Sequence, residues 1–319
     1  MVRYSLSRDP GTGTDYHAHS KRVINKDGSF NVKKAGLGPN TRNAYQSLVK
    51  MSWARFFLVS FIFLFIVNGV FALLYTWVGI EKLGEVEERG WFNEFMYAYY
   101  FSFQTFTTVG YGIYHPIGHL ANVISTIESI IGWMCFALVT GILYGRFSKP
   151  SARLMYSEKA LVAPYGNGRN SLQFRIANMR NSMLMEMEAT VLLSFVDKSR
   201  QNWKREFTPL LLERDHILFF PLTWTIVHPI DENSPFYNKT KEDIEKMDAE
   251  LLIRIKGYDD TFAQTVHSRF SYRCDEMVWG AQYHPAFDID NNGDIHLFFD
   301  RIHHYDKLDT STAFSGLSN

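Results

Sequence analysis

The sequence predicts two parts: an all-α membrane domain with two transmembrane helices and a re-entrant segment between them, and a β-sandwich that follows it. The first observation is a run without any charge, residues 56–77, which reads "FFLVSFIFLFIVNGVFALLYTW". The second is residues 120–145, "LANVISTIESIIGWMCFALVTGILYG", whose one ionisable residue is Glu128. At about 1.5 Å per residue, each run can cross a hydrocarbon layer ~30 Å thick. The third is a series of β-branched and aromatic runs downstream, bounded by turn residues.

The composition excludes several classes of protein. With 319 residues the chain has room for two domains. Lysine plus arginine and aspartate plus glutamate both number 33, so the charge balance gives no sign of a nucleic-acid partner. Cys135 and Cys274 lack metal-ligand spacing, and we expect both to be reduced. The sequence shows no combination of nucleophile, base and orienting residue, so we expect a protein that is not an enzyme.

The basic residues predict the orientation in the membrane. They are concentrated before Phe56 and after Gly145, whereas the segment between the spans, "EKLGEVEERG", is net acidic. Cytoplasmic loops carry an excess of lysine and arginine. Both termini should therefore be cytoplasmic, and the glutamate-rich loop should lie outside.

A third apolar stretch, residues 91–112, lies between the spans and reads "WFNEFMYAYYFSFQTFTTVGYG". It is too short for a helix and a return crossing. Asn93 is a suitable N-cap, so the pattern predicts a short helix from Asn93 to about Phe106, followed by extended chain up to Gly112. Irregular backbone at membrane depth is tolerated only inside protein or beside a water-filled cavity. This segment should therefore face a pathway.

The end of that stretch, Thr108, Val109, Gly110, Tyr111 and Gly112, is the selectivity-filter signature of potassium channels, in which carbonyl rings replace the hydration shell of the ion. The glycines permit conformations that let successive carbonyls point inward. The Thr108 hydroxyl would line the inner end, while Val109 and Tyr111 would point away and pack against the pore helix. A Gly-Tyr-Gly turn in an ordinary loop is the alternative, but the two flanking spans favour a filter. Bound K⁺ is the expected cofactor, with no organic cofactor, and one loop per chain implies a ring of copies.

Four further stretches give the chain a family resemblance: "GRFSKPSARLMYSEKALV", "LQFRIANMR", "WTIVHPIDENSPFY" and "SYRCDEMVWGAQY". Together with the spans and filter, they resemble the inward-rectifier potassium channels, specifically the bacterial KirBac branch, from about Tyr45 to about Tyr305. Eukaryotic relatives carry two extracellular cysteines around the filter, and this chain has none there. The resemblance implies a homotetramer in a bacterial inner membrane, with an immunoglobulin-like cytoplasmic β-sandwich that extends the pore.

The predicted organisation has four parts. Residues 1–40 form a cytoplasmic segment, disordered in part; residues 41–150 hold the pore domain, with spans at about 56–77 and 119–146; residues 151–305 form the β-sandwich; residues 306–319 are a C-terminal tail. Within the sandwich, Leu172, Phe174 and Ile176 alternate as in a strand. A short helix near "KEDIEKM" should be capped by Thr240, and "DIDNNGD" should form a hairpin turn rather than a calcium loop.

The second span is expected to line the pore. Phe136, Thr140 and Tyr144 recur every fourth residue, although a core stripe would give the same spacing. The resemblance favours the pore: Phe136 takes the position where strong rectifiers hold an acidic residue, and Tyr144 falls at the bundle crossing, where the family carries its gate. We therefore expect weak rectification. Glu128 should have a structural role behind the filter.

The same alignment suggests two acidic residues for the cytoplasmic pore, Glu276 and Asp215.

The segment before the first span, "NAYQSLVKMSWARFF", has the helical spacing of an interfacial amphipathic helix, similar to the slide helix of the family. The predicted contacts with anionic lipid, including phosphoinositide, are Trp53, Arg55, Arg146, Lys149 and Arg153. Plain anchoring by positive charge is the alternative, and both remain open. A channel gated by a soluble ligand at the cytoplasmic domain is the other functional alternative, although the tail contains no glycine-rich nucleotide-binding unit.

Overall fold

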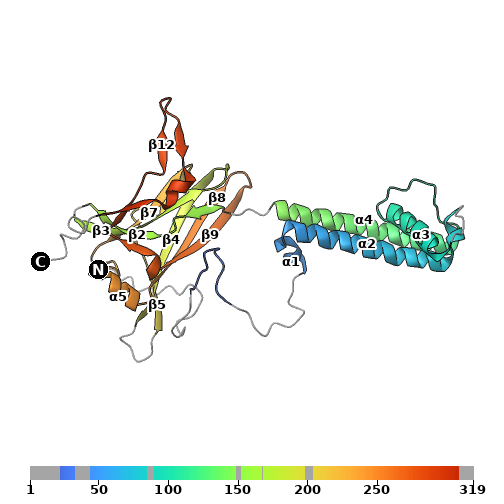
Figure 1. Cartoon of the computed structure of the whole chain (residues 1–319), viewed down its shortest axis with the longest axis horizontal. Helices are drawn as coiled ribbons and strands as arrows, with labels where there is room; N and C mark the ends of the chain where they lie inside the picture. Colours follow the sequence, from blue (N-terminus) through green and yellow to red (C-terminus); the bar gives the residue numbers. More distant parts are fainter. Residues whose placement is uncertain are drawn as a thin grey trace. The chain divides into compact units, whose positions relative to one another are not determined.

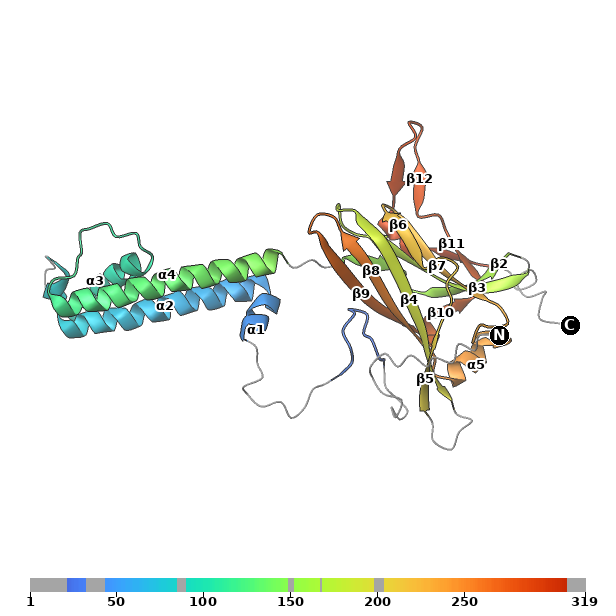
Figure 2. The ribbon, with the colours of Figure 1, turned by 180° about the vertical axis from the view of Figure 1, so that it is seen from behind.

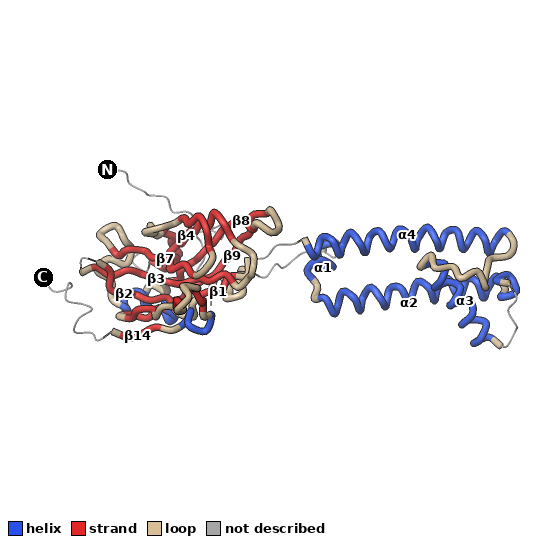
Figure 3. The backbone as a smooth tube through the Cα atoms, turned by 90° about the horizontal axis from the view of Figure 1, so that it is seen from above, coloured by secondary structure: helices blue, strands red, loops and turns tan. Residues whose placement is uncertain are grey.

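The computed structural model describes residues 22–32, 44–84, 90–148, 152–166, 168–197 and 204–308. The chain divides into two compact units, a helical unit within Ala35–Lys149 and a β-rich unit made of Met1–Lys34 and Pro150–Asn319 (Figures 1 and 3). Each unit is described below by itself.

The helical unit contains the two predicted spans and the predicted pore helix. Its helices are α1 (Ala44–Lys50), α2 (Trp53–Val78), α3 (Trp91–Phe106) and α4 (His119–Phe147), with a short 3-10 turn η2 (Ile80–Leu83). The prediction that Asn93 caps the pore helix is wrong: Gly90 holds the N-cap position, and the Asn93 amide donates to the Gly90 carbonyl at 3.0 Å. Gly90 has φ 90°, a conformation that glycine adopts readily and asparagine less so, and the N-cap therefore lies three residues earlier in the sequence than the predicted polar cap.

The short helix α3 lies against α2 and α4 (Figures 1 and 2). The shared core includes Phe71, Ala72 and Tyr75 of α2 with Ala98 and Phe101 of α3. The Tyr75 and Phe101 rings meet edge to face, with their centroids 4.9 Å apart. Re-entrant α3 is thus held by packing within its own chain.

The outer faces of the long helices are apolar and exposed. Only 17% of the most hydrophobic window of α2, and 17% of that of α4, is buried. A core helix of a soluble protein would be mostly buried, so these surfaces are suited to lipid. Exposed Trp77 and Trp91 lie at one end of the unit and Trp53 begins α2 at the other, as in the aromatic belts of membrane proteins.

The β-rich unit is a sandwich of two sheets (Figure 2). The first sheet has the order β1 (Leu154–Tyr156), β3 (Arg169–Asn178), β2 (Ala160–Tyr165) and β10 (Met277–Trp279), with β7 (Thr223–Ile230) also paired to β3. The second has the order β5 (Lys204–Pro209), β4 (Leu184–Asp197), β8 (Glu250–Asp259) and β9 (Gln264–Arg273), with β6 (His216–Phe220) paired to β4. Smaller elements are α5 (Lys241–Lys246), η3 (Cys274–Glu276), β11 (Ala281–Tyr283), β12 (Phe287–Ile289), β13 (Ile295–Leu297), η4 (Phe299–His303) and β14 (Tyr305–Lys307).

Sequence alternation predicted the core face correctly. Leu172, Phe174 and Ile176 of β3 are at most 2% exposed and lie in the core between the sheets. The stretch "HILFFPLTWTIV", residues 216–227, divides at Pro221 into β6 and the first part of β7, which belong to opposite sheets. Proline lacks the backbone donor that a continuous ladder would need.

The predicted helix cap and hairpin turn are also present. The Thr240 hydroxyl accepts from the Asp243 amide and the Asp243 carboxylate accepts from the Thr240 amide, which is a capping box. β12 and β13 pair antiparallel around a turn that contains Asn292 and Gly293, whose φ is 89°. The hairpin stands out from the sandwich in Figure 2.

Within the predicted N-terminal segment, the structure describes residues 22–32. These residues form a small turn closed by a bridge between Ile24 and Phe30, and they belong to the β-rich unit. Val23 and Ile24 are buried against Phe207 and Leu252. We call residues 22–32 the N-terminal clip. The rest of the predicted segment, and the tail beyond residue 308, lie outside the described residues.

Candidate ion pathway

The segment directly after α3, residues 108–112, has a positive φ at three of its residues. Gly110 and Gly112 have φ 51° and 85°, in the left-handed region that glycine adopts without strain. Thr108 also has a positive φ, 59°, which is uncommon for a residue with a branched side chain. The two glycines are therefore required by the backbone itself.

The pore helix holds the inner end of this loop through backbone hydrogen bonds. The Gln104 carbonyl accepts from the Val109 amide at 2.9 Å and from the Gly110 amide at 3.3 Å. The Thr107 hydroxyl donates to the Phe103 carbonyl at 2.6 Å. These bonds fix the position of the loop relative to the end of α3.

The side chains of Val109 and Tyr111 do not pack as expected on the pore helix of their own chain. They are 54% and 74% exposed. Both side chains are therefore left largely uncovered by their own chain. This exposure differs from the expectation that both side chains pack against the pore helix.

One face of α4 packs on the other helices of the chain. Ala121, Ser125, Glu128 and Gly132 are its buried residues. An added methyl group on Gly132 would contact the Phe106 carbonyl oxygen directly and would lie 3.0 Å from the Phe106 carbonyl carbon. The absence of a side chain at Gly132 therefore allows α4 to touch the last turn of the pore helix.

Phe136, Thr140 and Tyr144 lie on the part of α4 that its own chain leaves uncovered. All are exposed, Phe136 at 73% and Tyr144 at 74%. With about 3.6 residues per turn, each step of four residues advances the side chain by about 40° around the helix. From Phe136 to Tyr144 the side chains therefore turn progressively away from the buried face of α4, and they are free to face another chain or an ion pathway.

Arg146, expected among the lipid contacts, is instead bound within the chain. Its guanidinium donates to the carbonyls of Leu48, Val49 and Met51, at and just beyond the end of α1. It also stacks on Trp53, with its Cζ atom 4.5 Å from the ring centroid. The last carbonyls of a helix lack partners within the helix. Arg146 supplies hydrogen-bond donors to these carbonyls. It lies two residues beyond Tyr144 and so joins the amphipathic helix α1 to the end of α4.

The other lipid candidates differ in their surroundings. Trp53 is 41% exposed and packs on Phe147, with ring centroids 4.9 Å apart. Arg55 is exposed on α2, and Arg153 is exposed just before β1 in the β-rich unit. Lys149 lies outside the described residues.

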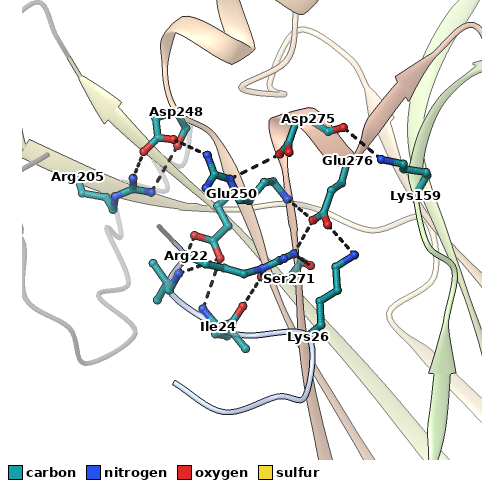
Figure 4. A network of polar contacts seen from close by, with 12 residues as sticks. Arg22, Ile24, Lys26, Lys159, Arg205, Asp248, Glu250, Ser271, Asp275 and Glu276 are labelled. Atoms are coloured by element: carbon teal, nitrogen blue, oxygen red, sulfur yellow. Dashed lines mark hydrogen bonds and ion pairs between the residues drawn. The ribbon is translucent and has the colours of Figure 1, made fainter. Parts of the chain in front are cut away.

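Glu276 does not present the free carboxylate expected of a residue in a cytoplasmic pore. It is 8% exposed and pairs with Arg22 at 2.5 Å and Lys26 at 2.8 Å, both from the N-terminal clip (Figure 4). Burial alone would raise the pKa of Glu276, but hydrogen bonds from Lys26, the Arg273 amide and Arg22 outweigh it and hold the pKa below the usual 4.5. The contribution of ionised Glu276 to docking of the clip should therefore be complete above pH 4.5 and be lost as the pH falls through the lowered pKa.

A second carboxylate also holds the clip. The amides of Val23 and Ile24 donate to Glu250, and the Ser271 hydroxyl donates to the Ile24 carbonyl at 2.6 Å (Figure 4). Sequence reasoning missed this docking, because no local pattern in the clip points to a strand so far along the chain.

Asp215, the other cytoplasmic-pore candidate, has a side chain that is 72% exposed, just before β6. Its carboxylate lies 3.5 Å from Nδ1 of His216. Among the described residues, no group of three or more histidine, cysteine, aspartate or glutamate side chains could hold a metal ion. Asp215 therefore remains a candidate for contact with soluble cations.

Comparison with known proteins agrees with this architecture. A family described as "Ion channel" matches residues 59–149, and a family described as "Inward rectifier potassium channel C-terminal domain" matches residues 154–316. The inward rectifier potassium channel Kirbac3.1 of Paramagnetospirillum magnetotacticum is 34% identical over 274 residues, which cover 85% of this chain and 90% of that relative.

Two mammalian proteins are more distant. The G protein-activated inward rectifier potassium channel 1 of Bos taurus is 29% identical over 311 residues, 88% of this chain and 61% of that relative. Its counterpart of Homo sapiens is 29% identical over 296 residues, 85% of this chain and 58% of that relative. Two membrane-spanning helices, a filter loop and a β-sandwich, matched over nearly all of a bacterial relative, place the chain in the inward rectifier potassium channel family, in its bacterial KirBac type.

Proposed function

We propose that four copies of this chain form one potassium-selective pore through the filter Thr108–Gly112. The observation that carries the proposal is the conformation of Gly110 and Gly112 at the end of a re-entrant helix, between two helices that can cross a membrane. Replacing the hydration shell of an ion takes carbonyls from several directions, which one loop cannot supply. The exposed Val109 and Tyr111 side chains supply the surface on which neighbouring copies pack.

The gate of the proposed channel is Tyr144, near the inner end of α4. A ring of such side chains closes a pore by narrowing it and excluding water. Arg146 transmits movement of the amphipathic helix α1 to this gate, because its guanidinium holds the carbonyls at the end of α1. The support is therefore a direct contact between the gate helix and the interfacial helix.

In the proposed channel, anionic lipid at the inner leaflet controls the gate through the contact between α1 and α4. Arg55 is exposed in the first turn of α2, two residues after Trp53. Each basic side chain gains ~1 kcal/mol near an anionic membrane surface. In our proposal Arg55, Lys149 and Arg153 bind lipid headgroups, whereas Arg146 acts chiefly as the link between α1 and α4. The channel lies in a bacterial inner membrane with both termini in the cytoplasm, on the basis of its basic flanking segments.

The proposal is tested by ⁸⁶Rb⁺ uptake into liposomes that contain the purified protein. Uptake should be driven by a K⁺ gradient, be blocked by Ba²⁺, and be lost in Gly110→Ala while the tetramer still assembles, because alanine disfavours the backbone conformation at that position. Liposomes with and without phosphoinositide test the lipid control. Uptake by the Gly110→Ala variant at the level of the parent protein would contradict the role of the filter.

A further inference from the structure

Four polar side chains meet in the interior of the helical unit, where α2, α3 and α4 pack together. Asn68 and Tyr75 come from α2, Ser102 from α3 and Glu128 from α4; Tyr75 is 1% exposed and the others are 0% exposed. Within the described part of the chain, no lysine, arginine or histidine forms an ion pair with Glu128. A carboxylate buried without a counter-charge at membrane depth is strongly disfavoured.

The contacts of this cluster form a chain across the three helices. The Tyr75 hydroxyl lies 2.7 Å from Oε2 of Glu128, and Oγ of Ser102 contacts Oε1 of Glu128. The same Ser102 oxygen lies 3.0 Å from Oδ1 of Asn68. The Asn68 amide nitrogen donates one proton to the Leu64 carbonyl at 2.8 Å, and this bond turns Oδ1, an acceptor, toward Ser102.

Counting protons separates two states of the cluster. A serine hydroxyl has one proton to donate. If Glu128 were ionised, Ser102 would give that proton to the carboxylate, and Oδ1 of Asn68 would be buried without a donor. If Glu128 is a carboxylic acid, it donates to Ser102, Ser102 donates to Asn68, and Tyr75 donates to the remaining Glu128 oxygen. Only the second arrangement satisfies every group and leaves no buried charge.

We infer that Glu128 is held as a neutral carboxylic acid and acts as a positioning residue for the pore helix. Glu128 and Gly132 lie one turn apart on α4, and their contacts, Ser102 and Phe106, lie one turn apart on α3. The cluster and the close approach at Gly132 thus fix the end of the pore helix on two successive turns, directly before the filter. The consequence for selectivity rests on the proposed conduction through the filter, whereas the protonation state does not.

Infrared spectroscopy of the full-length protein in liposomes at neutral pH tests the protonation state. The wild type should show the C=O stretching band of a protonated carboxylic acid, shifted in D₂O and absent in Glu128→Gln. Tyr75→Phe should shift this band, because it removes one hydrogen bond to the acid. Identical spectra for wild type and Glu128→Gln would overturn the inference. This result is independent of whether the protein conducts.

Ion flux tests the positioning role. Glutamine has the shape of the neutral acid and can donate to Ser102 and accept from Tyr75, so Glu128→Gln should keep the preference of the wild type for Rb⁺ over Na⁺. Glu128→Ala and Ser102→Ala leave buried polar groups unpaired and should reduce that preference by about tenfold. Ser129→Ala is the matched control, since the Ser129 hydroxyl donates only to the Ser125 carbonyl of its own helix, at 2.8 Å. If Glu128→Gln lost as much selectivity as Glu128→Ala, the negative charge would be the functional group and the inference would be wrong.

Discussion

Substitution of Gly132 by alanine tests how closely the pore helix is positioned by α4. The new methyl group would contact the Phe106 carbonyl oxygen and lie 3.0 Å and 3.1 Å from the Phe106 carbonyl and α-carbons. Carbon atoms pack at about 3.5–4.0 Å, so one of the two helices must retreat by roughly 0.5–1 Å. The neighbouring atoms belong to backbone and cannot rotate away. Overpacking of this kind costs about 1–3 kcal/mol.

The displaced group is the carbonyl end of the pore helix. This end carries the partial negative charge of the helix dipole and leads directly into the filter. A shift of roughly 0.5 Å is already at the limit that a binding site tolerates. At about 1.4 kcal/mol per tenfold change, we expect ⁸⁶Rb⁺ uptake by Gly132→Ala to fall by about tenfold or more, with the tetramer still assembled.

Gly69→Ala is the control for this experiment. Gly69 lies in α2, and an added methyl group there meets nothing within 4 Å. Both substitutions raise the helix propensity of their position by the same amount, about 1 kcal/mol. The difference in ⁸⁶Rb⁺ uptake between the two variants therefore reports the contact with Phe106. Equal uptake by Gly132→Ala and Gly69→Ala would refute the reasoning that this contact sets the geometry of the filter.

Three further predictions concern the gate link, rectification and pH. Arg146→Ala should change ⁸⁶Rb⁺ uptake even in neutral lipid, because it releases the end of α1, whereas Arg55→Ala should alter only the dependence on anionic lipid; identical behaviour of the two would argue against the link. Phe136→Asp should convert weak, shallow block by cytoplasmic spermine into strong block in bilayer recordings, since it places carboxylates in the pore; steep block of the wild type, unchanged by the substitution, would show that Phe136 does not control rectification. Burial lowers the pKa of His228, whose ring nitrogens lie 2.6 Å from the Leu211 carbonyl and 2.8 Å from the Ser234 hydroxyl. The unfolded chain binds the proton first, so thermal unfolding should show stability declining as the pH falls below the ordinary value of 6.5, and a His228→Gln variant should lose part of that dependence.

Sequence patterns correctly predicted the helices and strands whose formation depends mainly on residues close together in the sequence. In lipid, a helix can satisfy all the backbone polar groups of a long apolar run within the run itself, which is why α2 and α4 were predictable. The alternation of Leu172, Phe174 and Ile176 identified the buried face of β3, because side chains in a strand point to opposite faces in turn. The positive φ of Gly110 and Gly112 was also predictable, because glycine adopts this conformation without strain.

Contacts between distant parts of the chain were not predictable. Glu276 is paired with Arg22, 254 positions away, and neither residue belongs to a pattern that indicates the other. Arg146 reads as a membrane-anchoring charge in the sequence, yet its partners are carbonyls exposed only once α1 has formed and packed on α4. The pore helix α3 begins at Trp91 with Gly90, not a polar residue, as its N-cap, because the cap residue has a positive φ that favours glycine.

The most direct test of potassium selectivity is the reversal potential of the purified wild-type protein in a planar bilayer, with K⁺ on one side and Na⁺ at equal concentration on the other. Selective carbonyl coordination at Thr108–Gly112 predicts a reversal potential displaced far toward the value for a membrane permeable to K⁺ alone. A reversal potential near zero would mean that the two ions permeate equally, and would contradict the account.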